Sequence, residues 1–299
     1  MKIVFFGTPD FAVPTLDKLT NHYNVAAIVT ASDKERGRGR KVSYTPIKEY
    51  AIENDIKVLQ PEKLSDEPFI EELKEIDADL FIIVAFRILP KSVFELPKLG
   101  SFNLHGSLLP KYRGAAPIQW VLINGDTETG LTTFFLKEKV DTGNILMQKK
   151  VKIEPDDNFG TLHEKMKDIG AQLVLDTVSK IESGNITEKE QKNQEASPAP
   201  KITKELCEIN WNQPAEKVHN LIRGLSPFPT AFFTHKKQKY KVYRSKIENS
   251  GKLLPGEIEQ TKNEIFVGCS ENTLKILELQ LEGRKRMTAD AFIRGYSLK

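Results

Sequence analysis

Short apolar runs alternate with helix-like stretches along the N-terminal part of the chain. These runs predict buried strands at residues 3–6, 25–30, 57–59 and 80–85. Apolar side chains at helical spacing predict helices at residues 11–19, 44–54 and 68–76. Strands that alternate with helices in this way favour an α/β fold, with a Rossmann-like, doubly wound and mostly parallel sheet.

The pattern changes in the second half of the chain. A long helical period over residues 156–184 ends at a glycine, and the polar stretch after it contains Ser-Pro-Ala-Pro, which is typical of a semi-rigid linker. A short helix at residues 211–223 is followed by β-like runs at 230–234, 240–244, 256–258, 265–269 and 274–281. Short strands in this number favour a small OB-like β-barrel. We therefore expect a catalytic domain at residues 1–188, a linker at 189–205 and a C-terminal domain at 206–299.

Composition narrows the class of protein. With 28% charged and 39% hydrophobic residues among 299, the chain has the balance of a folded globular protein. Its first apolar run is too short for a signal peptide, and no stretch has the length of a membrane span. Cys207 and Cys269 form neither a disulfide framework nor a zinc motif. We expect a cytoplasmic protein that has no membrane partner and no metal.

Charge is distributed unevenly along the chain. Residues 205–299 hold 16 of the 44 Lys and Arg residues but only 11 of the 41 Asp and Glu residues. A basic C-terminal part is expected if that part contacts a polyanion, although a surplus of this size is also ordinary for a solvated surface.

Candidate chemistry gathers between residues 101 and 143. Asn103 and His105 are two residues apart, so in a strand their side chains lie on one face while Leu104 turns into the apolar packing. An amide donor can stabilise developing negative charge, and an imidazole can take or give a proton near neutral pH. Asp141 can orient that imidazole or accept the proton that a reaction releases. Together these three side chains suit addition to a carbonyl.

The motifs around these residues resemble those of methionyl-tRNA formyltransferases. The chain reads NLHGSLLP from Asn103, then RGAAPI, GDTETG and DTG, with FGTPDFAVP upstream and SPAPKI downstream. A weaker match continues into RGLSPFP near the C-terminus, so the resemblance covers nearly the whole chain. It departs at residues 84–90, VAFRILP, where the family often has one residue more and a glycine.

The resemblance implies an activity and a set of residues. The expected reaction transfers a formyl group from 10-formyltetrahydrofolate, a co-substrate, to the α-amino group of methionyl-initiator-tRNA for translation initiation. The expected catalytic residues are Asn103, His105 and Asp141. The residues expected to contact folate are Ser107, Leu108, Leu109, Pro110, Phe86 and Arg87. A monomer is expected.

Basic segments are candidates for contact with tRNA. Residues 31–43 lack an apolar period and alternate glycines with basic residues, which is typical of a mobile loop that orders on phosphates or simply stays solvated. By resemblance, Arg36, Arg38, Arg40 and Lys41 of this loop would contact tRNA. Residues 236–239 and 284–286 either contact RNA backbone or keep hairpin turns soluble.

Other functions are weighed against this one. The first turn, GTPDF, has one glycine and a proline where a dinucleotide fold needs several glycines, so a dinucleotide enzyme is excluded. A glycinamide ribonucleotide formyltransferase shares the Asn–His–Asp pattern but needs no additional C-terminal domain. A nucleotide-sugar formyltransferase, the main alternative, pairs a similar catalytic domain with a small barrel. A tRNA-binding module with an inactive site is the remaining possibility, and formylation assays distinguish it.

Overall fold

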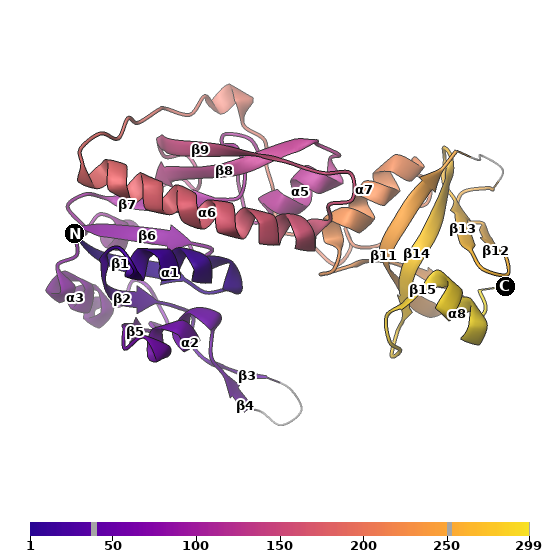
Figure 1. The fold of residues 1–299 in the computed structure, drawn as a ribbon, viewed down its shortest axis with the longest axis horizontal. Helices are drawn as coiled ribbons and strands as arrows, with labels where there is room; N and C mark the ends of the chain where they lie inside the picture. Colours follow the sequence, from indigo (N-terminus) through magenta and orange to yellow (C-terminus); the bar gives the residue numbers. More distant parts are fainter. Residues whose placement is uncertain (37–40, 250–252, 299) are drawn as a thin grey trace. The chain divides into compact units, whose positions relative to one another are not determined.

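A computed structural model describes residues 1–36, 41–249 and 253–298 of the chain (Figure 1). The chain forms two compact units. Unit 1 comprises Met1–Gly114, Gly130–Val151 and His163–Pro198. Unit 2 comprises Ala115–Thr129, Lys152–Leu162 and Ala199–Lys299. Both units are therefore built from segments that are far apart in the sequence.

Unit 1 is organised around a seven-stranded sheet with the order β5-β2-β1-β6-β7-β8-β9. Its strands are β1 (Lys2–Gly7), β2 (Asn24–Val29), β5 (Lys57–Leu59), β6 (Leu80–Val84), β7 (Ser101–His105), β8 (Glu128–Phe135) and β9 (Ile145–Lys152). The pairs from β5 to β7 are parallel, whereas β8 runs antiparallel to β7. The predicted mostly parallel sheet is confirmed. The strand order reverses between β1 and β6, and ligands bind at such a point in open α/β sheets.

Helices cover both faces of this sheet. They are η1 (Asp10–Ala12), α1 (Val13–Thr20), α2 (Pro46–Glu53), α3 (Glu67–Ile76), α4 (Lys91–Phe94) and α6 (Phe159–Glu182). On one face, α3 and α4 bury Phe69 and Val93 against strand residues such as Phe6. On the other face α6 packs so closely that a Cβ on Gly170 would lie 2.8 Å from the Leu104 side chain. This two-sided cover explains why β1 and β6 are almost wholly apolar.

The basic segment at residues 31–43 differs from the expected loop. Its described residues include two short strands, β3 (Lys34–Arg36) and β4 (Lys41–Ser43), which pair antiparallel with Arg36 opposite Lys41. Backbone hydrogen bonds make such a ladder without an apolar period, which is why the side-chain pattern did not indicate it. Arg38 and Arg40 lie outside the described residues.

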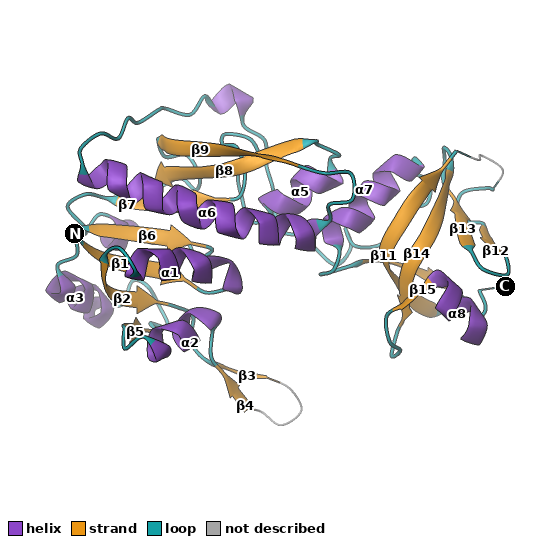
Figure 2. Ribbon diagram, in the orientation of Figure 1, coloured by secondary structure: helices purple, strands orange, loops and turns teal. Residues whose placement is uncertain are grey.

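Unit 2 contains a second sheet, which is antiparallel and strongly curved (Figure 2). Its strands are β10 (Ala231–His235), β11 (Gln238–Glu248), β12 (Ile258–Gln260), β13 (Ile265–Gly268), β14 (Thr273–Leu281) and β15 (Met287–Thr288). Their order is β10-β11-β14-β13-β12, and β15 pairs with β14. The helices of the unit are α5 (Pro117–Ile123), α7 (Ala215–Leu225) and α8 (Ala289–Gly295). The sheet is the barrel-like curl that the β-rich pattern of the C-terminal part predicted.

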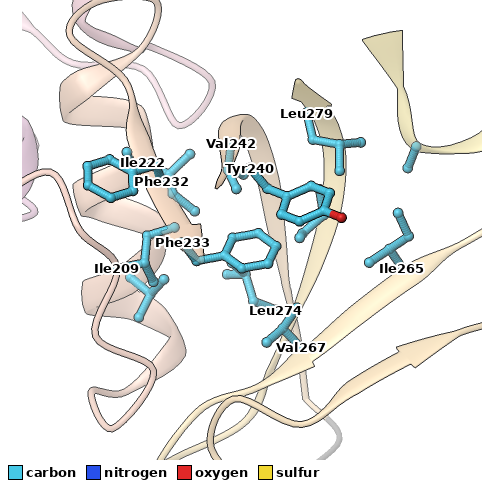
Figure 3. Close-up of a cluster of buried hydrophobic side chains, with 14 of the residues drawn as sticks. Ile209, Ile222, Phe232, Phe233, Tyr240, Val242, Ile265, Val267, Leu274 and Leu279 are labelled. Carbon is cyan, nitrogen blue, oxygen red and sulfur yellow. The ribbon is translucent and has the colours of Figure 1, made fainter. Parts of the chain in front are cut away.

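One apolar cluster holds the strands and helices of unit 2 together (Figure 3). At its centre the rings of Phe233 and Tyr240 stack with their centroids 5.3 Å apart, and Ile222 of α7 is buried with them. Both cysteines are buried in the same cluster, and burial raises the pKa of the Cys269 thiol to about 11. A neutral, buried thiol contributes packing rather than nucleophilic chemistry.

The segment expected to be a linker is packed against unit 1 over residues 189–198. Lys189 and Ile145 exchange two backbone hydrogen bonds, and Gln191 is buried. The backbone N–H of Arg113 donates to the carbonyl oxygen of Ser197 at 2.8 Å. Among the described residues, no helix combines the length and the apolar character that crossing a membrane requires.

Candidate active site

Strand β7 brings Asn103 and His105 to the carboxyl-terminal edge of the parallel strands. Asn103 lies opposite Ile83 of β6, and His105 lies opposite Thr132 of β8. Leu104 turns to the other face, where it packs beside Gly170 of α6. The shared face of Asn103 and His105, predicted from their spacing, follows from the side-chain alternation of this strand.

The His105 imidazole is buried and held through one of its two nitrogens. Its Nε2 lies 2.8 Å from the carbonyl oxygen of Tyr112, and the edge-on ring of Phe134 is 6.4 Å away between centroids. A carbonyl oxygen can only accept, so Nε2 carries the hydrogen of this bond. In the neutral imidazole Nδ1 is therefore the acceptor. It faces the Asp141 carboxylate, with Oδ2 at 3.9 Å.

Asp141 lies in the connection between β8 and β9, in a backbone conformation that few non-glycine residues adopt. Its φ is +55°, and its Oδ2 accepts a hydrogen bond from the backbone N–H of Gly114 at 2.8 Å. Two residues later, a Cβ on Gly143 would lie 1.5 Å from the carbonyl oxygen of Phe135. Close backbone approach at Gly143 therefore sets the path by which the chain carries Asp141 back to His105.

Asn103 contrasts with its neighbours because its side chain makes no hydrogen bond to any described residue of the chain. It is only partly buried, whereas His105 on the same face is buried. An amide on the same strand face as a buried imidazole, with neither donor bonded to the described residues, can donate to an incoming oxygen atom.

The segment expected to contact folate forms a tightly bonded turn after β7. The Ser107 hydroxyl donates to the carbonyl oxygen of Lys111 at 2.6 Å, and the Thr132 hydroxyl bridges the Ser107 carbonyl and the Leu109 N–H. Ser107 and Leu109 are buried, whereas Leu108 and Pro110 are partly exposed. Of these four side chains, Leu108 and Pro110 are thus the ones that a ligand can reach.

Phe86 and Arg87 follow β6 and turn toward neighbouring parts of unit 1. The Phe86 ring packs edge-on against Phe6 with centroids 5.7 Å apart. The Arg87 guanidinium donates to the carbonyl oxygens of Pro61 and Glu62 at 2.9 and 3.0 Å. Arg87 therefore ties the end of β6 to the segment that follows β5, while remaining exposed.

Sequence reasoning missed the polar layer behind Asp141. Arg113 donates to Gln191, and Gln191 in turn donates to the backbone of the Asp141 turn. Burial lowers the pKa of the Arg113 guanidinium, and the Asp141 carboxylate opposes this shift. The available signal in the sequence was the motif SPAPKI, which resembles the family's and lies inside the polar stretch expected to be a linker.

Basic residues of unit 2 meet at one end of its curved sheet. The N–H of Glu282 donates to the carbonyl oxygen of Lys239 at 2.9 Å, so the 236–239 turn and the 284–286 turn lie side by side. Arg286 forms two hydrogen bonds of 2.6 Å with Glu278, and its guanidinium stacks over the Tyr243 ring. In unit 1, Arg36 and Lys41 occupy facing positions of the β3–β4 ladder.

One group with a donor set for a metal ion occurs among the described residues, at Asp10, His163 and Glu164. The Lys167 ammonium lies 3.6 Å from Asp10 Oδ2 and 3.3 Å from Glu164 Oε2. The Lys167 ammonium already pairs with both carboxylates, so the group is an ion-pair cluster at the surface.

Known proteins share both parts of this chain. Residues 1–178 match the family Formyl transferase, and residues 201–297 match Formyl transferase, C-terminal domain. Methionyl-tRNA formyltransferases of Caldanaerobacter subterraneus and Bacteroides fragilis are 44% and 46% identical, over the full chain and 98% and 96% of their own lengths.

Solved structures agree on the fold. The crystal structure of a sugar 3N-formyl transferase, determined with dTDP and 5-N-formyl-THF, superposes with a TM-score of 0.71 at 21% identity, covering 95% of this chain and 99% of the other. Methionyl-tRNA formyltransferase from Clostridium thermocellum gives 0.58 at 18% identity, covering 84% and 95%. From its sequence relatives and matched domains, the chain belongs to the methionyl-tRNA formyltransferase family.

Proposed function

We propose that this protein transfers the formyl group of 10-formyltetrahydrofolate to the α-amino group of methionyl-initiator-tRNA. The observation that carries the proposal is the placement of Asn103 and the buried His105 on one face of β7, with the Asp141 carboxylate 3.9 Å from His105 and no hydrogen bond from the Asn103 amide to the described residues. Relatives named methionyl-tRNA formyltransferase, at 43% to 46% identity over nearly the full chain, support the choice of acceptor.

Charge develops on the formyl oxygen as the amine adds to the formyl carbon. In this proposal the Asn103 amide donates a hydrogen bond to that oxygen, and a protonated Nδ1 of His105 supplies a second donor. Removing one such donor from an oxyanion site costs on the order of 10²–10³ in rate. The Tyr112 carbonyl, which takes the Nε2 hydrogen at 2.8 Å, keeps the ring turned so that Nδ1 is the reactive nitrogen.

The reaction also moves one proton. A bond forms between the amine nitrogen and the formyl carbon, the bond from that carbon to the folate nitrogen breaks, and a proton passes from the amine to the departing nitrogen. Asp141 accepts this proton and His105 delivers it. The 3.9 Å between His105 Nδ1 and Asp141 Oδ2 leaves room for a bridging water or the attacking amine. No covalent intermediate with the enzyme is needed.

Contacts with the two substrates are assigned from the family resemblance and from the exposure of the side chains. We assign folate to the surface of Ser107–Pro110, Phe86 and Arg87, with Leu108 and Pro110 offering exposed side chains and the remaining residues shaping the backbone around them. We assign tRNA to Arg36, Arg38, Arg40 and Lys41, together with the basic turns of the C-terminal part. Residues 1–188 then carry catalysis and residues 206–299 carry tRNA docking. A cytoplasmic monomer that uses no metal is part of the proposal.

A single-turnover assay tests the proposal. The enzyme is mixed with 10-formyltetrahydrofolate and, in parallel, with charged initiator tRNA, glycinamide ribonucleotide or an amino sugar nucleotide. Transfer to the tRNA alone is expected. Transfer to a small amine would keep the Asn103–His105–Asp141 chemistry and replace the acceptor, whereas no transfer to any acceptor would indicate a binding module.

The basic hairpin segment is tested separately. Residues 31–43 are replaced by a Gly/Ser segment of equal length, and formylation of initiator and elongator methionyl-tRNA is compared. We expect weaker tRNA binding and poorer discrimination between the two. Unchanged discrimination would rule this segment out as a selectivity element.

A further inference from the structure

We propose that Gln191 is a positioning residue that fixes Asp141 for catalysis, and that the segment at residues 189–198 is a strap that holds the active site together. The inference rests on the proposed function because it takes Asp141 as a catalytic group. It starts from the observation that a polar side chain of the expected linker is 6% exposed. Glutamine is seldom buried to this degree unless its amide is fully hydrogen-bonded.

All four hydrogen-bonding positions of the Gln191 amide are used. Its Nε2 donates to the carbonyl oxygens of Asp141 at 3.0 Å and Gly143 at 2.7 Å. Its Oε1 accepts from Nε and Nη2 of Arg113 at 3.1 and 2.7 Å. A glutamine amide has two donor hydrogens and two acceptor lone pairs, so none remains.

This pattern also fixes which way the amide points. If the amide were flipped, its NH₂ would face the guanidinium of Arg113 and its oxygen would face two carbonyl oxygens. None of the four hydrogen bonds could then form. Gln191 therefore holds the backbone at Asp141 and Gly143 in one arrangement, 50 and 48 residues away in the sequence.

The backbone it holds is one that needs support. Asp141 has a φ of +55°, a left-handed backbone conformation that costs a non-glycine residue conformational free energy. Hydrogen bonds to the carbonyl oxygens at both ends of the Asp141–Gly143 turn offset this cost locally. The carboxylate that the turn presents then meets the N–H of Gly114 and faces His105.

The same strap holds the other side of the site. The Ser197 hydroxyl accepts from the N–H of Tyr112 at 2.9 Å, and the Ser197 carbonyl accepts from the N–H of Arg113 at 2.8 Å. Tyr112 is the residue whose carbonyl oxygen orients His105. Residues 191 and 197 thus fix the two turns that set the relative placement of Asp141 and His105.

The test separates positioning from simple structural support. Gln191→Met keeps the length and volume of the side chain but removes every hydrogen bond, and Gln191→Glu keeps the acceptor for Arg113 but removes both donors to the Asp141 turn. We expect both variants to lower kcat by about tenfold or more, since misplacement by about 1 Å can cost 10²-fold, with little change in KM for folate. Asn193→Ala is the matched control, because Asn193 accepts a hydrogen bond from Arg113 at 3.0 Å and, among the described residues, makes no hydrogen bond to the Asp141–Gly143 turn.

A double-mutant cycle with Asp141→Ala decides the mechanism, with kcat measured per folded enzyme at a temperature below thermal unfolding. If Gln191 acts through Asp141, Gln191→Met changes kcat by less than about twofold once Asp141 is alanine.

An equal loss in both backgrounds, or full kcat in Gln191→Met and Gln191→Glu, would overturn the positioning role while leaving the proposed function intact. If Asp141→Ala itself retained full kcat, the proposed role of Asp141 would fail and the positioning role with it. Should Gln191→Met fold poorly, Gln191→Glu takes its place in the cycle.

Discussion

His105 Nε2 lies 2.8 Å from the carbonyl oxygen of Tyr112, seven residues further along the chain. Because that oxygen can only accept, the bond fixes the hydrogen on Nε2 and leaves Nδ1 to face Asp141. The backbone of a turn, rather than a carboxylate, therefore selects the tautomer of the imidazole. The Asp141 carboxylate, which does not select the tautomer, faces Nδ1 at a distance across which a proton can be exchanged through a bridging group.

Replacing His105 by alanine is expected to lower kcat by about 10²–10⁴-fold, the usual range for a general acid or base. KM for folate should change little, because the ring is buried and directed toward Asp141. Single-turnover rates and folate titrations measure the two effects. His22→Ala is a matched control, since His22 is an exposed histidine whose ring, within the part of the chain that the structure describes, hydrogen-bonds only the Lys18 carbonyl oxygen. Equal losses in rate and folate affinity would contradict a catalytic role.

Asn103→Ala is expected to lower kcat by on the order of 10²-fold, because one donor to the developing oxyanion is removed. Asn103→Asp should be at least as damaging, since a carboxylate would repel the same charge. The fold should tolerate both changes because the Asn103 side chain makes no hydrogen bond to the described residues. Thermal unfolding checks this second point. A large loss of stability with intact kcat would show that the amide is structural.

Gly143→Ala is expected to reduce both stability and activity. The added methyl would lie 1.5 Å from the Phe135 carbonyl oxygen, so the strand end or the Asp141 turn must move. Overpacking of this kind costs about 1–3 kcal/mol. Gly295→Ala is the control, because a Cβ there meets no atom within 4 Å. Chemical denaturation and single-turnover rates of the two variants should differ accordingly.

The basic turns of unit 2 predict a salt-dependent interaction with tRNA. Lys237→Gln combined with Lys285→Gln removes two exposed charges from the adjoining turns. For every phosphate that is no longer neutralised, the slope of log affinity against log salt should fall by about 0.7–0.9. Lys246→Gln with Lys262→Gln removes the same charge elsewhere in the unit, where both side chains are also exposed. If both pairs changed the slope equally, the effect would reflect net charge rather than a docking surface.

The stability of unit 2 should fall at mildly acid pH because of His219. Burial lowers the pKa of this imidazole and Arg223 lowers it further, whereas Asp156 and Glu216 oppose the shift. Nδ1 of the ring lies 3.0 Å from the Ser245 hydroxyl. Above the unfolded-state pKa of about 6.5, the ring is neutral in both states and does not change the free energy of unfolding with pH. As pH falls below that value the unfolded state binds the proton first, so the fold loses stability until the folded ring also titrates. His219→Gln should reduce the difference in unfolding midpoint between pH 7.5 and 5.5, and an unchanged difference would assign the effect to other groups.

The sequence by itself determined the elements and the reacting face. Apolar runs and helical periods predicted β1, β2, β5 and β6 with the helices between them. The apolar signal is strongest in β1 and β6, because burial on both faces of a parallel sheet requires apolar side chains. The spacing of Asn103 and His105 placed both on one face of β7, because alternation is a local property of an extended chain. The first helix was less well predicted, since its start is the 3₁₀ turn Asp10–Ala12 rather than regular α-helix.

Only the tertiary structure decided how the site is held. The pairing of His105 with the Tyr112 carbonyl, the return of Asp141 through Gly143, and the burial of Gln191 all join residues through backbone groups. Every residue except proline carries the same backbone donor and acceptor, so such bonds leave no mark on the side-chain pattern. A polar stretch therefore resembled a linker in the sequence. In the folded chain this stretch is the strap behind the active site, because the Gln191 amide hydrogen-bonds residues of two distant turns.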